Sequence, residues 1–112
     1  MSVLARSAGV LLHLTSLPSE GGIGDLGPPA LRWIDLLSAA GWGYWQMLPI
    51  HPTEPRFDNS PYHSTSAHAG NPLFISLEWL VQEGWLRPNE KEIARIPPGD
   101  RVDYVSVRRL KR

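Results

Sequence analysis

The first 50 residues hold two short apolar runs with a loop and an amphipathic helix between them, and this order constrains the fold most. The runs are residues 9–13 and 44–48. Residues 30–40 between them form one apolar helical stripe made of Ala30, Trp33, Ile34, Leu37 and Ala40. A strand–helix–strand unit implies parallel strands and a right-handed crossover. Both runs are apolar on both faces, as in a sheet that helices cover, so we predict an α/β fold.

The segment before this helix is rich in glycine, so a phosphate-binding loop has to be considered. Residues 21–27 match neither G-x-G-x-x-G directly after a strand nor G-x-x-x-x-G-K-[ST], and Asp25 would repel a phosphate. We therefore favour a turn that packs closely against the mouth of the fold. Pro28 and Pro29 suit the first turn of the helix, and Gly41 suits its end.

The second half of the chain begins with a long loop over residues 49–72, directly after the second predicted strand. Loops of this length in a compact domain are usually functional, and α/β folds place their sites at the carboxyl ends of parallel strands. Residues 73–85 predict a short apolar stretch leading into a helix that ends at Gly84. Its apolar face is expected to hold Leu77, Leu80, Val81 and Trp85.

The last part of the chain is polar and then basic. Residues 87–101 are rich in proline and are interpreted as a connector. The basic residues Arg108, Arg109, Lys111 and Arg112 would suit an arm for nucleic acid or membrane. The helical spacing of Tyr104, Val107 and Leu110 favours the first turns of an amphipathic helix instead.

Composition excludes several classes of protein. The 112 residues suffice for one small domain but not for a (β/α)₈ barrel, which needs about 250. A formal net charge of zero argues against nucleic acid and anionic membrane as partners. The absence of cysteine excludes disulfides, zinc ribbons and thiol nucleophiles. No apolar run reaches the roughly 20 residues of a membrane span, and no signal peptide is recognisable.

No catalytic or metal-binding constellation stands out. The histidines are not spaced as a metal site and are expected to bond locally or to touch a ligand: His13, His51, His63 and His68. No serine lies in a nucleophile elbow, and none of the acidic residues is singled out as a catalytic pair. Trp45 is expected in the core, whereas Phe57 and Tyr62 in the long loop suit stacking on a sugar.

Five segments, taken in order, resemble the amino-terminal part of the 4-alpha-glucanotransferase (amylomaltase, disproportionating enzyme) family. They are His13-Leu-Thr-Ser-Leu-Pro18, Gly22-Ile-Gly-Asp-Leu-Gly27, Tyr44-Trp-Gln-Met-Leu-Pro49, Ser60-Pro-Tyr62 and Ser66-Ala-His-Ala-Gly-Asn-Pro72. Val102-Asp-Tyr104 resembles a later family segment that starts a helix. The resemblance covers almost the whole chain, and five ordered motifs are more specific than any single one.

The resemblance implies the first βα units of a (β/α)₈ TIM barrel, incomplete in this chain over residues 1–112. The family cuts an α-1,4-glucosidic bond in a maltodextrin and holds the donor as a covalent glycosyl–enzyme intermediate. It then passes the donor to another glucan or to glucose, with retention of configuration. The chemistry needs no cofactor and no metal, and its Asp nucleophile and Glu acid/base come from later strands. No catalytic residue therefore maps onto this chain, which alone is expected to be inactive.

The resemblance places substrate-contacting positions in the long loop. Ser60 and Tyr62 match positions near the cleaved bond, and Phe57 stands where the family often has a tyrosine in an outer glucan groove. His63 replaces the glutamine that usually follows the tyrosine. Other departures are Asn59 for an aspartate and His68 for a phenylalanine. Asp25 matches an acidic position of the first loop, and its expected role is structural.

The implied partner is an α-1,4-glucan, with no nucleic acid and no membrane, and in addition the missing carboxyl-terminal part of the enzyme. The parent would be a cytoplasmic enzyme of maltodextrin and glycogen metabolism. Two alternatives stay open: a non-catalytic maltodextrin-binding module, or the complementing half of a split enzyme.

Overall fold

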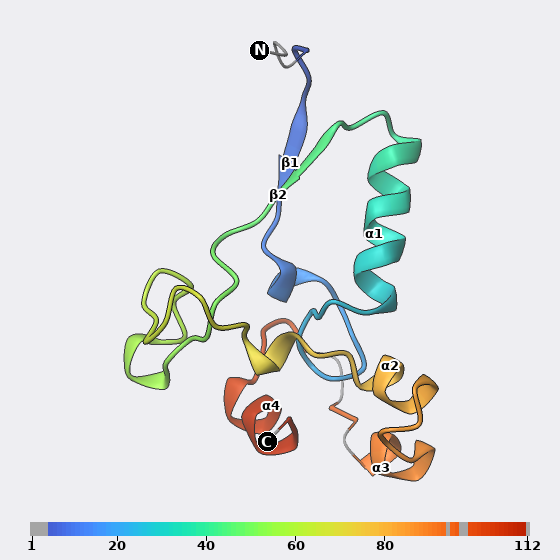
Figure 1. Ribbon diagram of the computed structural model, residues 1–112, viewed down its shortest axis with the longest axis vertical. Coiled ribbons are helices and arrows are strands. Elements are labelled where there is room, and N and C mark those ends of the chain that lie inside the picture. The colour runs from blue at the N-terminus through green and yellow to red at the C-terminus, as the bar shows by residue number, and fades with distance from the viewer. Residues whose placement is uncertain (1–4, 94, 97–98, 112) are drawn as a thin grey trace.

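A parallel strand–helix–strand unit forms the upper part of the molecule (Figure 1). The computed structural model describes residues 5–93, 95–96 and 99–111. Strand β1 (Gly9–Leu11) pairs in parallel with β2 (Tyr44–Gln46), with Gly9 opposite Tyr44 and Leu11 opposite Gln46. The predicted parallel pair is confirmed, but each strand is shorter than predicted. After Leu12 the chain turns into the 3-10 helix η1 (Leu14–Ser16), which ends the pairing.

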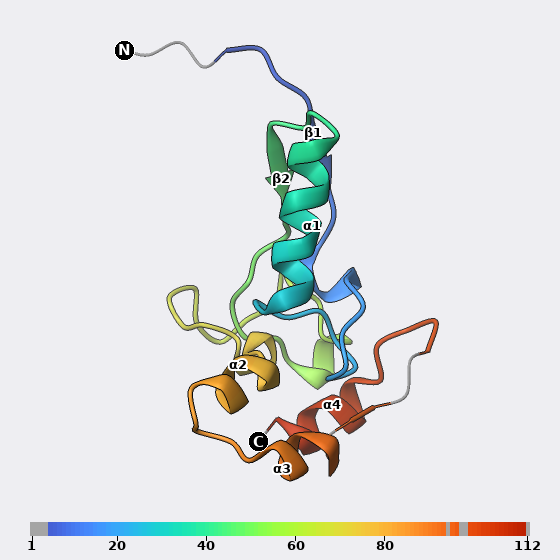
Figure 2. The same ribbon diagram turned by 90° about the vertical axis from the view of Figure 1, so that its right-hand side faces the viewer.

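Helix α1 (Pro28–Ala39) connects the two strands and lies along one face of the pair (Figures 1 and 2). It begins at the two prolines, and Gly41 follows its end with a φ of +80°, a conformation that glycine adopts without strain. Ala30 and Leu37 are buried as predicted. Ile34 is 47% exposed, contrary to the predicted stripe, because a sheet of two short strands is too narrow to cover the whole apolar face.

The remaining elements lie below the sheet in Figure 1. They are η2 (Pro55–Phe57), η3 (Pro72–Phe74), α2 (Leu77–Gln82), α3 (Pro88–Ile93) and α4 (Tyr104–Leu110). The helix predicted after residue 73 is confirmed, and Gly84 has a φ of +77° just past its end. Trp85 lies beyond that helix and is 81% exposed, so it does not share the predicted apolar face.

The segment interpreted as a connector contains a helix. α3 starts at Pro88, and the Glu90 carboxylate accepts a hydrogen bond from the Arg87 amide at 2.8 Å, which favours the first turn. The predicted helix in the basic tail is confirmed as α4. The Asp103 carboxylate caps it by accepting from the amides of Val105 (3.1 Å) and Ser106 (3.2 Å). None of the helices in the described part of the chain is long and apolar enough to cross a membrane.

The core lies at the carboxyl ends of the strands, where loops and short helices meet. Its buried members are Leu14, Leu17, Ile23, Ala30, Leu73, Phe74 and Val107. Trp45 packs against this cluster as expected, stands edge-on to Trp33 at 6.5 Å, and donates from Nε1 to the Leu12 carbonyl oxygen at 2.7 Å. Segments far apart in sequence thus converge on one point below the sheet.

The sheet itself is covered on one side only. Leu11 is 59% exposed and Tyr44 is 51% exposed, so the expectation that both faces are covered is not met by the described residues. The radius of gyration is 15.6 Å. A compact domain of this length has about 13 Å. The chain therefore leaves apolar surface and strand edges in contact with solvent.

These exposed surfaces predict marginal stability of the isolated chain. Open strand edges and apolar patches favour association between copies, and few residues are fully buried. We expect a broad thermal transition by circular dichroism and self-association that grows with concentration by analytical ultracentrifugation. A sharp, cooperative melting transition of a purified monomer would contradict this prediction.

Candidate functional site

The loop over residues 49–72 leaves β2 at its carboxyl end and forms a lobe to one side of the core (Figure 1). Its turn is built by η2 and by Asp58 and Asn59, whose φ values of 53° and 56° lie in the left-handed region. Aspartate and asparagine tolerate this conformation better than other side chains. The Ser60 amide donates to the Phe57 carbonyl oxygen at 2.9 Å, which closes the turn.

The four residues assigned from the sequence to substrate binding lie on this lobe. The rings of Phe57 and His63 stack with centroids 4.5 Å apart, and the Arg56 guanidinium lies 4.8 Å from the Phe57 centroid. The Ser60 hydroxyl accepts from the Tyr62 amide at 3.3 Å, and the Tyr62 side chain is 67% exposed. The structure therefore pairs Phe57 with His63 and leaves the Tyr62 ring open to solvent.

A pocket of about 240 Å³ with both polar and apolar lining lies between this lobe and the ends of the strands. Its lining residues are His13, Thr15, Ser16, Leu48, Thr53, Asn59, Pro61, Asn71, Phe74 and Tyr104. They present hydroxyls, amides and one imidazole, which are groups that bond to sugar hydroxyls. Most of these residues have no site role that the sequence predicts. The sequence did offer one signal: His13 and Leu48 are the last residues of the two predicted strands, at the edge where sites are expected.

Burial in this pocket favours the neutral form of His13. Burial lowers the pKa of its imidazole below the ordinary value, and its ring meets Phe74 edge-on at 6.0 Å. Its Nδ1 is buried and has no hydrogen-bond partner within residues 5–93, 95–96 and 99–111. A neutral imidazole offers one donor and one acceptor, which suits a polar, uncharged ligand. His51 bonds locally, with Nε2 3.1 Å from the Pro61 carbonyl oxygen.

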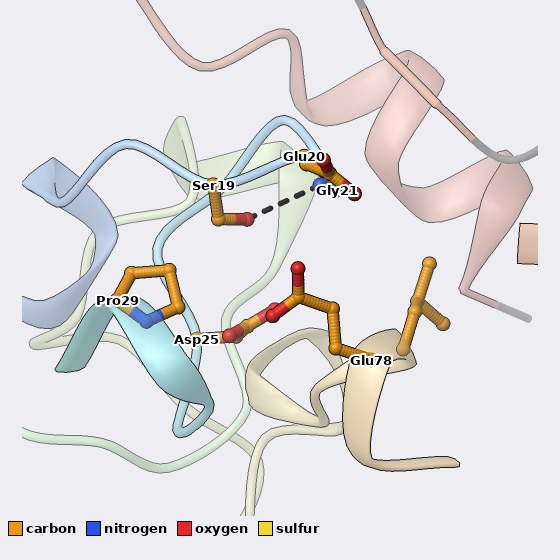
Figure 3. Close-up of a pocket in the computed structure, with 7 residues that line it drawn as sticks. Ser19, Glu20, Gly21, Asp25, Pro29 and Glu78 are labelled. Atoms are coloured by element: carbon orange, nitrogen blue, oxygen red, sulfur yellow. Dashed lines mark hydrogen bonds between the residues drawn. The ribbon is translucent and has the colours of Figure 1, made fainter. Parts of the chain in front are cut away.

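A second, smaller pocket adjoins the glycine-rich loop and contains carboxylates (Figure 3). Figure 3 shows the carboxylates of Asp25 and Glu78 beside each other, with Ser19 and Glu20 above them. The space holds about 20 Å³, too little for a sugar ring. Within the part of the chain that the structure describes, no group of three or more His, Cys, Asp or Glu side chains is arranged to hold a metal ion.

Asp25 has a structural partner, as the sequence analysis expected. The Lys111 ammonium lies 3.2 Å from Asp25 Oδ2 and donates to the carbonyl oxygens of Leu73 and Ile75, each at 2.8 Å. The Asp25 side chain is 6% exposed and the Lys111 side chain is 2% exposed. Burial raises the pKa of Asp25, although Lys111 opposes the shift, and burial lowers the pKa of Lys111. The pair therefore connects loops at a desolvation cost, and its role is to fix their positions.

The glycine-rich loop packs as closely as expected. A Cβ atom at Gly24 would overlap the Leu14 carbonyl oxygen, and one at Gly27 would overlap the Ser76 hydroxyl. Both glycines thus allow the loop to lie directly on neighbouring backbone and side chains. This close packing agrees with a structural turn at the mouth of the fold.

Comparison with known proteins identifies the family. The family model described as 4-alpha-glucanotransferase matches residues 12–112. The chloroplastic/amyloplastic 4-alpha-glucanotransferase of Solanum tuberosum is 46% identical over 108 residues, which cover 95% of this chain and 18% of that protein. The 4-alpha-glucanotransferase of Aquifex aeolicus is 47% identical over 95 residues, covering 85% of this chain and 19% of that protein. The chain belongs to the 4-alpha-glucanotransferase family.

The fold agrees with that assignment. Amylomaltase from Streptococcus agalactiae in complex with acarbose superposes with a TM-score of 0.87 at 36% identity, covering 96% of this chain and 21% of that one. The described residues therefore have the fold of the matching part of that enzyme. The chain spans about a fifth of the length of the curated relatives that it matches.

The buried ion pair generates a test of its structural role. Lys111→Met leaves the Asp25 carboxylate buried without a partner, a change that typically costs about 3–5 kcal/mol of folding free energy. The double variant Asp25→Leu/Lys111→Met removes both charges, and we expect it to be more stable than Lys111→Met alone. Because the isolated chain is expected to be only marginally stable, the folded fraction at low temperature, followed by far-UV circular dichroism, ranks the two variants and the parent chain.

Arg109→Met is the matched control, since Arg109 is an exposed cation of the same helix. Equal destabilisation by Lys111→Met and Arg109→Met would contradict a specific role of the buried pair.

Proposed function

We propose that this chain supplies the first βα units of a (β/α)₈ barrel and the glucan-facing loop of a 4-alpha-glucanotransferase. The complete enzyme transfers a segment of an α-1,4-glucan to another glucan or to glucose, with retention of configuration. Membership of the family and the parallel β1–β2 pair support this assignment. Residues 49–72 take the position at the carboxyl ends of the strands at which barrel enzymes bind substrate.

The exposed ring of Tyr62, which follows directly in sequence a residue that lines a pocket, is the observation that carries the proposal. Tyr62 belongs to the lobe, and the neighbouring residue Pro61 lines the cavity of about 240 Å³. An aromatic face combined with hydroxyl and amide groups is the combination that binds a sugar, because the ring covers its C–H face and the polar groups bond to its hydroxyls. We assign Tyr62 to stacking or hydrogen bonding with a glucose unit.

The other three loop residues take supporting roles in this proposal. The Ser60 hydroxyl accepts from the Tyr62 amide and so orients the backbone that carries the tyrosine. Phe57 and His63 present their stacked pair to an outer glucose unit, with the ring edges and the imidazole nitrogens available for contact. Phe57 has no hydroxyl, so its contribution is apolar.

The neighbour in the structural comparison supports a maltodextrin-type ligand. The Streptococcus agalactiae amylomaltase is in complex with acarbose, and it shares the fold of the described residues. We infer an α-1,4-glucan as the substrate of the enzyme to which this chain belongs.

The second partner in this proposal is the carboxyl-terminal part of the same enzyme. An apolar surface beside α2 is available for it, lined by Leu26, Ile50, Pro72, Ile75, Trp79 and Trp85 among others. Covering this surface and the open strand edges would remove apolar area from water.

Glucan binding by the chain tests the proposal. We expect saturation transfer from the dilute 112-residue chain to the protons of maltoheptaose in NMR. Tyr62→Ala should weaken binding by about threefold to tenfold, because a stacked aromatic ring contributes roughly 0.5–1.5 kcal/mol. Trp85→Ala is the matched control, since this aromatic side chain is also exposed but lies outside the lobe. Equal effects of the two substitutions would contradict the assignment of Tyr62.

The chain alone should not catalyse transfer. The resemblance places the nucleophile and the acid/base in later strands, and retaining chemistry needs both carboxyl groups. Incubation with maltotriose should therefore release no glucose above a buffer blank in a coupled glucose assay calibrated with added glucose. Glucose release that scales with the concentration of the chain would overturn this expectation.

A further inference from the structure

One cationic side chain connects the carboxyl-terminal helix to the base of the lobe. Arg108, in the last turn of α4, donates from Nη2 to the Thr53 carbonyl oxygen at 2.7 Å, to Thr53 Oγ1 at 3.2 Å and to Asn59 Oδ1 at 2.5 Å. Thr53 precedes Arg108 by 55 residues and Asn59 precedes it by 49. A guanidinium donor makes stronger hydrogen bonds than a neutral group because its charge assists them.

The two residues that Arg108 contacts stand at either end of the η2 turn. The Thr53 hydroxyl donates to Asn59 Oδ1 at 3.4 Å, and the backbone N–H of Asn59 donates to the Glu54 carbonyl oxygen at 3.0 Å. Asn59 has a φ of 56°, which sets the direction in which the chain leaves the turn. Ser60 follows Asn59 directly, and Tyr62 comes two residues after Ser60, so both lie on the segment that leaves this turn.

The contact differs from an ordinary surface interaction. Arg108 is half-buried, and its Nε atom is buried without a hydrogen-bond partner among the residues described. Arg109, the next residue on the same helix, is exposed. Truncating Arg108 would leave the partly buried acceptors of Thr53 and Asn59 without this donor, and unsatisfied buried polar groups are costly.

We propose that Arg108 is a positioning residue, which acts through Asn59 and Thr53 to hold the lobe closed and so orients Ser60 and Tyr62. The effect of Arg108 on loop conformation stands by itself. Its consequence for glucan affinity rests on the proposed function. A residue near one end of the chain thus controls a site formed about 50 residues earlier.

Limited proteolysis of the 112-residue chain tests the conformational part. Chymotrypsin cleavage after Phe57 and Tyr62 is quantified by mass spectrometry relative to cleavage after Tyr44, which lies in β2 outside the lobe. Arg108→Ala should raise this ratio by about tenfold, because a protease cleaves the locally open state and the lost bonds favour opening. Arg108→Lys, which keeps a cationic donor, should restore part of the protection.

Two matched variants make the result specific. Arg109→Ala removes a neighbouring charge from the same helix and should leave the ratio unchanged. Asn59→Gly removes the acceptor but keeps access to the left-handed conformation, so it should raise the ratio by itself. The double variant Asn59→Gly/Arg108→Ala should raise the cleavage ratio by less than the product of the two single fold-changes, because both substitutions break the same contact. An unchanged ratio in Arg108→Ala, or equal ratios in Arg108→Ala and Arg109→Ala, would overturn the proposal.

Saturation transfer to maltoheptaose separates this proposal from the function on which it rests. If both hold, Arg108→Ala weakens binding about as much as Tyr62→Ala, and Arg109→Ala does not. If the parent chain does not bind the glucan but the cleavage ratio rises in Arg108→Ala, the proposed function fails and the positioning role stands. If the parent chain binds and Arg108→Ala binds equally well, Arg108 does not position Tyr62.

Discussion

The arrangement of the loops depends on the buried ammonium of Lys111. It contacts the Asp25 carboxylate of the glycine-rich loop and the two carbonyl oxygens of Leu73 and Ile75 that flank the end of η3. A buried ammonium is tolerated only when oxygen atoms surround it, so these segments must meet at one point. The apolar cluster that includes Leu14 and Val107 lies beside this point, and its packing requires the same arrangement.

Helix α4 and the residue that follows it therefore contact two separate loops. Lys111, which follows its last residue, joins the loops of the core, and Arg108, one turn earlier, joins the lobe that carries Tyr62. Both cations were visible in the sequence as a basic tail, which by composition alone suits a nucleic-acid or membrane arm. Arg108 and Lys111 turn inward and donate to carboxylate, amide and carbonyl oxygens of the same chain. Their charges therefore position segments within the molecule.

One edge of the molecule is densely packed, whereas other surfaces stay apolar and exposed. The carboxyl ends of β1 and β2 hold a packed core, a pocket with mixed polar and apolar lining, and the lobe of residues 49–72. The opposite face of the sheet and the surface beside α2 remain apolar and exposed. Binding surfaces and catalytic carboxylates come from different strands in barrel enzymes. The chain spans about a fifth of the length of these relatives, and the loop proposed to bind glucan lies at the edge of the sheet where barrel enzymes place their sites.

Local pattern determined the strand–helix–strand order, the ends of α1 and α2, helix α4 and the family, because periodicity, proline, glycine and motif order are properties of neighbouring residues. The exposure of Ile34 and the shortness of the strands escaped it, because they depend on tertiary packing. The helix at Pro88 was missed although Pro88 and Glu90 are local signals for a first turn. Only the tertiary structure decided that His13 lines a cavity, that Phe57 stacks on His63, and that Arg108 reaches Asn59. These contacts depend on how the loops fold back on themselves and on the rest of the chain. That geometry cannot be derived from the residues next to either contacting side chain.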